Sequence, residues 1–170
     1  MNERKKRHSG KVNGAGVDYA LGEAPGHLLR RCQQRAVEIF MEEIGATRLT
    51  PRQFALLLTL AQRPGLTQTE LVEQTGIDRS TVGDMIDRLV RRGLVRRRRS
   101  GRDQRANTLA ILPAGATALR EALPAVERAQ LRIMAPLPQA MRGAFMAALQ
   151  LMANDAPKPE TEERPARRRE

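Results

Sequence analysis

The sequence predicts a mainly α-helical fold with one small β-hairpin. Two short segments between Leu66 and Gly93 repeat their apolar residues at helical spacing and are joined by a tight turn. The segments 94–99 and 106–112 then alternate apolar and other residues around a turn at Ser100–Asp103, which is typical of a hairpin. Apolar helices are expected on both sides of this unit. Two such helices followed by a hairpin indicate a winged helix-turn-helix, whose second helix enters the major groove of DNA.

The composition favours a partner that carries negative charge. The chain of 170 residues has 30 Lys and Arg against 19 Asp and Glu, which gives a net charge of +11. This excess favours nucleic acid first and an anionic membrane surface second. No apolar run is long enough to cross a bilayer and the basic N-terminus has no signal-like hydrophobic core, so no membrane partner is expected. The single cysteine excludes an internal disulfide and suits a reducing cytoplasm.

Residues 1–24 are predicted to form a basic, disordered arm, because they lack apolar periodicity. A solvated tail is the favoured interpretation, and an arm that touches DNA phosphates is the alternative. Pro25 and Gly26 then introduce a first helix, predicted from His27 to about Ile44. Its apolar face consists of Leu28, Leu29, Cys32, Ala36, Ile39 and Phe40.

Helix-start signals place the next helices. Thr50, followed by Pro51 and by Gln53 at the third helical position, predicts a capped helix start. Thr67 and Glu70 have the spacing of a second capping box. A short third strand is expected near Leu66, just before this second box.

The turn that follows is predicted to use Gly76 at a positive φ, with Asp78 capping the next helix. The apolar residues of that helix recur at helical spacing: Val82, Met85, Ile86, Leu89 and Val90. Gly93 is predicted to end it.

Two further apolar helices are predicted after the hairpin. The first begins at Pro113 and runs to about Met134, and Pro124 inside it should bend or interrupt it. The second is expected from Gln139 to Met152. Helices with this much apolar surface need a partner in so small a domain. Residues 155–170 are proline-rich with mixed charge and are predicted to be disordered.

Three features make the pattern more specific. Residues 93–97 read GLVRR, residues 103–105 form a D-x-R motif, and a hydrophobic strand leads to Gly115. In this order after a helix-turn-helix, they resemble the winged helix-turn-helix of the MarR family of bacterial transcription regulators. The resemblance covers residues 26–154. It departs at Leu112-Pro113, where the family has Leu-Thr, and proline at the first helical position is expected to begin the helix instead.

The resemblance implies one domain over residues 25–154. Within it, a winged helix-turn-helix spans about 47–112, and dimerisation helices span about 26–45 and 113–153. In the family these outer helices intertwine with those of a second subunit. A homodimer with double-stranded DNA as its partner is therefore expected.

The resemblance and the basic wing together assign DNA contact to residues of the helices and the hairpin. These are Gln68, Arg79, Ser80, Thr81, Gly83, Asp84, Arg88, Arg97, Arg98, Arg102, Asp103 and Arg105. Eight arginines lie between positions 91 and 105, and the guanidinium group suits phosphate and a narrow minor groove. A solvated hairpin is the alternative. Arg79 could read guanine. Asp84 either accepts from a cytosine amino group or orients a neighbouring arginine, and the second is favoured because acidic base contacts are rarer.

A polar stripe on the first helix is a candidate effector site. His27, Arg31 and Gln34 lie at steps of four and three residues beside the apolar face. In the family, small anionic or aromatic molecules bind between the first, second and fifth helices, so an aromatic acid or a coenzyme A thioester is the expected ligand. Polar residues of the surface or of a subunit interface are the equal alternative. Cys32 is interpreted as a buried structural thiol rather than a redox sensor, since Tyr19 is the only tyrosine.

These features predict a ligand-responsive, DNA-binding transcriptional regulator of the cytoplasm. The favoured form is a repressor that binds a pseudo-palindromic operator as a dimer and is released by a small aromatic or thioester ligand. The alternative is a sequence-tolerant architectural protein, for which the charge alone explains DNA binding. No enzyme, cofactor or metal site is expected, because the sequence offers neither a nucleophile with its base nor a cluster of metal ligands.

Overall fold

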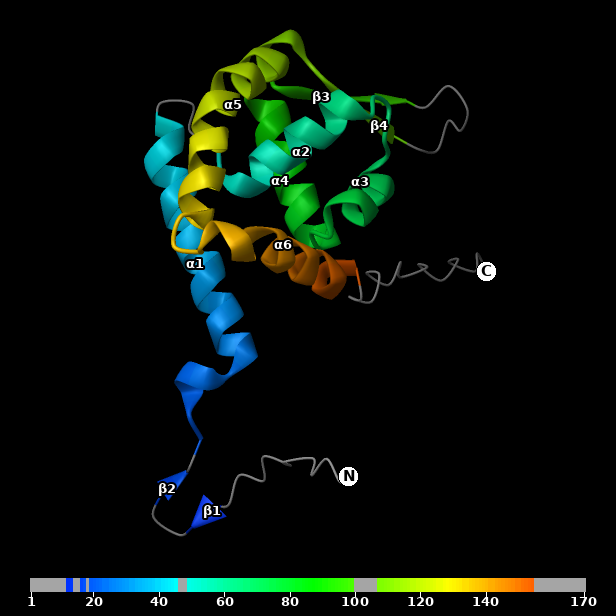
Figure 1. Ribbon diagram of the computed structural model, residues 1–170. Helices are drawn as coiled ribbons and strands as arrows, with labels where there is room; N and C mark the ends of the chain where they lie inside the picture. The colour runs from blue at the N-terminus through cyan, green and yellow to red at the C-terminus, as the bar shows by residue number, and fades with distance from the viewer. Residues whose placement is uncertain (1–11, 14–15, 18, 46–48, 100–106, 155–170) are drawn as a thin grey trace, which may run out of the picture.

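The computed structural model describes residues 12–13, 16–17, 19–45, 49–99 and 107–154. Its helices and hairpin follow the predicted order (Figure 1). The elements are β1 (Val12–Asn13), β2 (Gly16–Val17), a 3-10 turn η1 (Leu21–Glu23), α1 (Pro25–Ile44), α2 (Pro51–Gln62), α3 (Gln68–Thr75), α4 (Arg79–Arg91), β3 (Val95–Arg99), β4 (Asn107–Ile111), α5 (Pro113–Met134) and α6 (Gln139–Asn154). The predicted fold class, mainly helical with a hairpin wing, is confirmed.

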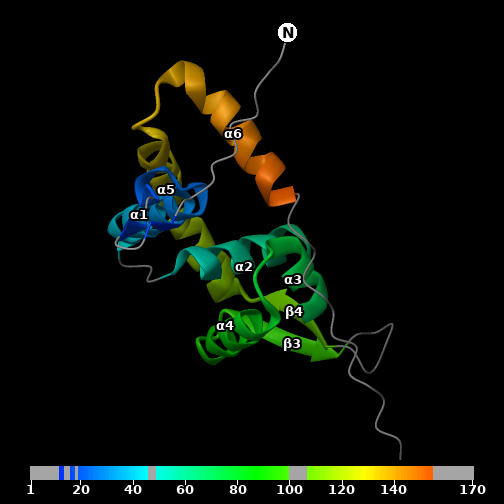
Figure 2. The same ribbon diagram turned by 90° about the horizontal axis from the view of Figure 1, so that it is seen from below.

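The core lies where α2, α3 and α4 meet the hairpin and the first half of α5 (Figure 2). Its largest fully buried side chains are apolar residues of α2, α3, α4, the hairpin and the segment before α2: Leu49, Leu56, Leu57, Leu60, Leu71, Val82, Ile86, Leu89, Val95 and Leu109. The α5 helix adds the fully buried Ala122. Burying an aliphatic side chain of this size contributes about 1.5–3 kcal/mol. The compact winged unit therefore has a core of its own within one chain.

The helix ends form as the local sequence predicts. Thr50 and Gln53 exchange hydrogen bonds of 3.2 Å in each direction in a capping box. Thr67 and Glu70 form the second box, with the Thr67 backbone N–H donating to Glu70 Oε2 at 2.7 Å. Gly76 ends α3 in the left-handed region at φ 65°.

The hairpin pairs β3 and β4 antiparallel, with Val95 opposite Ile111 and Arg97 opposite Leu109. The expected third strand near Leu66 is reduced to a single bridge between Thr67 and Thr108, beside a 2.8 Å hydrogen bond from Leu109 N–H to the Leu66 carbonyl. The wing is thus fixed to the segment that enters α3.

The structure differs from two expectations about regular structure. Within the stretch predicted to lack structure, β1 and β2 pair with Val12 opposite Val17, both β-branched, and η1 follows. Pro124 was predicted to bend or interrupt α5, and the interruption is wrong, because the helix continues through it to Met134. Ala122 and Ala125, on either side of the proline, are buried in the core, and the bend stays a prediction.

The outer helices leave much apolar surface open. α1 lies along α5 (Figure 1), yet only Ile39, Phe40 and Ile44 of α1 are buried. Cys32 is exposed, so its interpretation as a buried thiol is wrong for the single chain. α6 has no buried residue, although it was predicted as an apolar helix. None of the helices in the described part of the chain has the length and hydropathy needed to cross a bilayer.

Candidate DNA-binding surface and ligand pocket

The helix α4 has one buried face and one open face. Val82, Met85, Ile86 and Leu89 fix it to the core. The predicted contact residues lie on the other side: Arg79, Ser80, Asp84 and Arg88 are exposed, and Thr81 and Gly83 are half-buried. The open face of α4 can therefore enter a DNA groove without disturbing the core.

The first turn of α4 is stabilised by its cap. Asp78 Oδ1 accepts hydrogen bonds from the Thr81 backbone N–H at 2.8 Å and from the Ser80 hydroxyl at 2.7 Å. Bonds from Thr81, through its side chain and its backbone, and from Ser80 lower the pKa of Asp78 to about 2. The Ser80 hydroxyl, predicted to face DNA, is engaged in this cap.

α3 contacts α4 through two polar side chains. Gln68 Nε2 lies 3.5 Å from the Arg79 carbonyl, and Arg79 Nη2 donates to Thr69 Oγ1 at 2.7 Å. A Cβ at Gly83 would lie 3.2 Å from Gln68 Nε2, so glycine leaves room for that amide. The structure thus brings the predicted residues Gln68, Arg79 and Gly83 together, and adds Thr69, which the sequence analysis did not single out.

Asp84 has no ion pair among the described residues. The ion pair with a neighbouring arginine, which was the favoured expectation for Asp84, is therefore not formed in the described part of the chain. Its carboxylate stays open on the exposed face of α4.

The wing arginines divide between two faces of β3. Arg97 lies on the same strand face as buried Val95, and its Nη2 donates to Asp87 Oδ1 of α4 at 2.6 Å. Arg98 lies on the other face and is exposed, with no side-chain partner among the described residues. Arg97 thus fixes the hairpin to α4, while Arg98 has no such bond to a described residue. Arg102, Asp103 and Arg105, predicted to contact DNA, lie outside the described residues.

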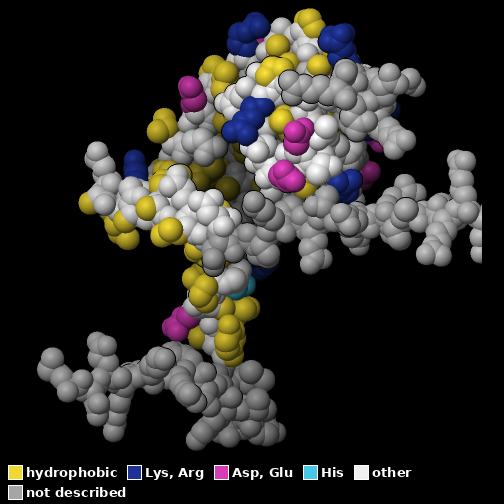
Figure 3. Space-filling model, turned by 90° about the vertical axis from the view of Figure 1, so that its right-hand side faces the viewer, with side chains coloured by type: hydrophobic (Ala, Val, Ile, Leu, Met, Phe, Trp, Pro, Cys, Tyr) yellow, Lys and Arg dark blue, Asp and Glu magenta, His cyan; other side chains and the backbone are white. Residues whose placement is uncertain are grey.

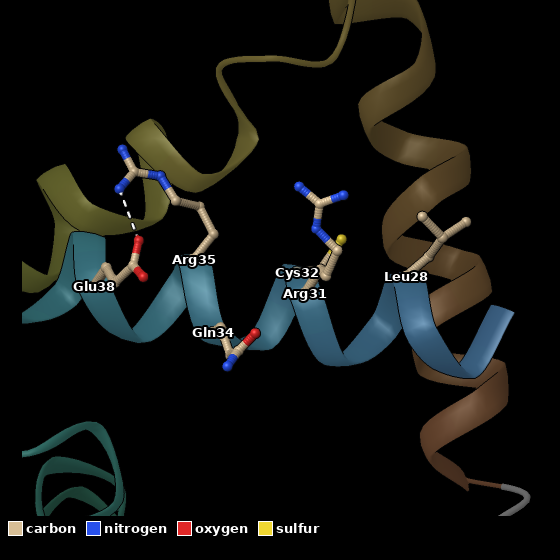
Figure 4. A pocket seen from close by; sticks show the side chains of 6 residues that line it. All are labelled: Leu28, Arg31, Cys32, Gln34, Arg35 and Glu38. Atoms are coloured by element: carbon tan, nitrogen blue, oxygen red, sulfur yellow. Dashed lines mark hydrogen bonds and ion pairs between the residues drawn. The ribbon is translucent and has the colours of Figure 1, made fainter. Parts of the chain in front are cut away.

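A hollow of about 420 Å³ lies along α1 (Figure 4). Within the described part of the chain, its lining residues come from this one helix: Leu28, Arg31, Cys32, Gln34, Arg35 and Glu38. In the view of Figure 4, Arg31 and Cys32 project to one side of the helix and Gln34 to the other. Among the described residues, the hollow is therefore bounded by α1 on one side, and its opposite side has to be formed by another element or another subunit.

The predicted stripe is only partly at this hollow. Arg31 and Gln34 line it, but His27 does not. The Arg30 side chain contacts both His27 and Gln34. Its Nη1 donates to Gln34 Oε1 at 2.9 Å, and its Nη2 lies 3.3 Å from His27 Nδ1. Arg35 also lines the hollow and was not among the predicted residues; it lies one helical turn after Arg31, and this spacing was the signal available in the sequence.

The two lining arginines differ in their partners. Arg35 Nη1 lies 3.0 Å from Glu38 Oε2 and 3.6 Å from Glu42 Oε1. Arg31 has no ion pair within the described residues. An uncompensated guanidinium beside the apolar Leu28 suits an organic anion with an apolar body. The described residues hold no group of three or more His, Cys, Asp or Glu side chains placed for a metal ion.

Comparison with known proteins identifies a matching family and several similar proteins. The model of the MarR family matches residues 49–106. The transcriptional repressor NicR of Pseudomonas putida is 30% identical over 79% of this chain and 85% of its own. BpsR of Bordetella bronchiseptica, in a structure on regulation of its DNA binding by 6-hydroxynicotinic acid, is 32% identical over 80% of this chain and 98% of its own, with a TM-score of 0.75.

The transcriptional repressor CouR is similar in two structures. Bound to a 23-mer DNA duplex, it is 36% identical over 78% of this chain and 94% of its own, with a TM-score of 0.72. Bound to p-coumaroyl-CoA, it is 34% identical over 80% of this chain and 96% of its own, with a TM-score of 0.73. The similarity therefore extends over the winged unit and the outer helices together.

Proposed function

The chain belongs to the MarR family of transcriptional regulators, and from that premise we propose that it is a repressor that binds a pseudo-palindromic operator as a homodimer. The observation that supports this best is the open face of α4, where exposed Arg79 and Arg88 stand opposite a fully packed apolar face. The net charge of +11 favours a polyanion as partner. We place its action in the cytoplasm, where the DNA lies, and assign it no catalytic activity.

Homodimer formation is supported by the unpartnered apolar side chains. Leu28, Leu131 and Leu151 are 42%, 70% and 74% exposed and lie on α1, α5 and α6. Figure 3 shows hydrophobic side chains on the narrow column below the body of the molecule and on the lobe that projects beside it. A second copy of these helices would cover them and would set two α4 helices about 34–36 Å apart, one turn of DNA.

The ligand proposed for the hollow on α1 is an aromatic acid or its coenzyme A thioester. BpsR responds to 6-hydroxynicotinic acid and CouR binds p-coumaroyl-CoA, and both compounds join an aromatic ring to an anionic group. Arg31 and Leu28 supply the matching cation and apolar contact. A ligand that binds the free dimer more tightly than the DNA-bound dimer would release the operator.

A competition experiment separates this function from sequence-tolerant DNA packing. The site that the protein selects from a random DNA pool should survive challenge with unrelated DNA at moderate salt, with affinity roughly 1,000-fold or more higher. Equal loss of both complexes would instead support the architectural alternative, because charge-driven binding does not distinguish sequences.

Ligand release is tested with two neighbouring arginines. Arg31→Ala removes the unpaired guanidinium at the hollow, while Arg30→Ala removes one that lies outside it and bonds to His27 and Gln34. Arg31→Ala should raise the ligand concentration that frees the operator roughly 10- to 150-fold, because a hydrogen bond to a charged group contributes about 1.5–3 kcal/mol. Arg30→Ala should change it little. A gel-shift titration measures both, and equal release by Arg31→Ala and wild type would rule out this pocket.

A further inference from the structure

Arg79 is the first residue of α4, and its guanidinium is fixed from the neighbouring helix. Its Nη2 donates to Thr69 Oγ1 at 2.7 Å. The Thr69 hydroxyl is free for this bond, because the α3 cap is made by Thr67 and Glu70 instead. Thr69 is β-branched and half-buried, which limits its χ1 angle to two main rotamers, and the bond to Arg79 selects one of them. The acceptor therefore has a defined position relative to α4.

The backbone at Arg79 is fixed by the adjacent residue of α3. Gln68 Nε2 lies 3.5 Å from the Arg79 carbonyl oxygen. Gly83, one turn further along α4, leaves the space that this amide occupies, since a Cβ there would lie 3.2 Å from Gln68 Nε2. Consecutive residues of α3 thus contact the backbone and the guanidinium of the same arginine.

An exposed arginine at the start of a helix otherwise has many rotamers. Ordering a long side chain on binding lowers affinity, and a side chain that is already oriented loses less. With one N–H occupied by Thr69, the remaining donors of the planar guanidinium point in a restricted set of directions. A restricted direction distinguishes one base edge from another, whereas a freely moving cation binds any phosphate.

We propose that Thr69 is a positioning residue for DNA reading: it holds the Arg79 guanidinium toward one base pair and thereby sets the sequence preference at that position. This rests on the proposed function, in which Arg79 faces the major groove. Thr69 acts through Arg79, so its effect should vanish when Arg79 is absent.

The test uses the full-length protein and the DNA site that wild type selects from a random pool. Thr69→Val keeps the shape of the side chain and removes the acceptor, and Thr69→Ser restores a hydroxyl. Thr69→Val should lower the preference for the base pair facing Arg79 roughly 2- to 10-fold, in the range of one net hydrogen bond. Thr69→Ser should retain most of it. Thr59→Val is the matched control, because the Thr59 hydroxyl bonds to the Ala55 carbonyl within α2.

A double-mutant cycle then identifies the route. In an Arg79→Ala background, Thr69→Val should cause no further loss of preference. An equal loss with and without Arg79 would overturn the proposal and give Thr69 a role of its own, and so would an unchanged preference in Thr69→Val. Thermal unfolding of each variant shows whether a loss comes from folding. If wild type selects no common site, the proposed function as a specific repressor is wrong as well. If wild type selects a common site and only the double-mutant cycle gives the wrong result, the proposed repressor function remains and the positioning role of Thr69 is wrong.

Discussion

Among single residues, Gly115 determines how the wing joins α5. The Leu112 N–H donates to the Leu94 carbonyl at 2.9 Å, which draws the start of α5 against β3. A Cβ at Gly115 would run into the Leu94 carbonyl oxygen and would lie 2.9 Å from Ile111 Cγ1. The clashing atom belongs to the backbone, which cannot move away by a change of rotamer as a flexible side chain can. Glycine is therefore required here by close approach.

Gly115→Ala should destabilise the protein by about 1–3 kcal/mol, the usual range for overpacking. Urea unfolding of the purified protein measures this. Gly143→Ala in α6 is the control: nothing lies near its Cβ position, and alanine should stabilise the helix by about 0.5–1 kcal/mol. If the two variants have the same unfolding free energy, the close approach at Leu94 does not constrain the fold.

At the scale of elements, the sequence predicted what depends on near neighbours. The capping boxes at Thr50 and Thr67 follow from residues three positions apart, so the starts of α2 and α3 could be placed. The continuity of α5 through Pro124 could not be predicted in the same way, because the residues around the proline contain no signal for it. Helix boundaries were accordingly predicted better than helix continuity.

Residue roles within elements were harder to predict. The assignment of Arg97 to DNA overlooked Asp87, because the pairing depends on which face of β3 packs on α4. The ligand stripe on α1 was placed by helical spacing and the family resemblance, and His27, which lies 3.3 Å from Arg30 Nη2, does not line the hollow. The contact of Thr69 with Arg79 likewise depends on the angle between α3 and α4. Residue types indicated which elements carry candidate residues, and side-chain geometry selected the partners.

The two faces of β3 lead to different salt dependences of DNA binding. Arg98→Ala should flatten the slope of log affinity against log salt by about one unit, because a free guanidinium that contacts phosphate releases a counterion. Arg97→Ala should change the slope less, since its charge is already paired with Asp87 at 2.6 Å. Fluorescence anisotropy at several salt concentrations measures both slopes. Equal slopes for Arg98→Ala and wild type would remove Arg98 from the phosphate-contacting set.

At the scale of the whole molecule, the winged unit is packed and the outer helices are not. Ion pairs join α1 to α5, with Arg132 contacting Glu42 at 2.6 Å and Glu43 at 2.7 Å, and Arg128 contacting Glu43 at 2.9 Å. These bonds from Arg132 and Arg128 lower the pKa of Glu43. These ion pairs fix α1 to α5 but cover little apolar surface. The exposed apolar side chains of α6 and of α1 therefore need a second chain to cover them.

The outer helices should therefore hold the dimer together. Removing residues 139–170 deletes α6 and should give a chain that is monomeric or aggregated and loses operator affinity, because a single α4 reaches only one half-site. Removing residues 155–170 alone should leave the dimer intact. Leu151→Glu in the full chain tests the same surface without truncation: Leu151 is 74% exposed in one chain, and a charge there should weaken association only if a partner covers it. Light scattering after gel filtration gives the mass of each species, and gel shifts give its DNA affinity. A chain of residues 1–138 that stays soluble, monomeric and fully able to bind the operator would mean that α6 has another purpose and that one subunit suffices.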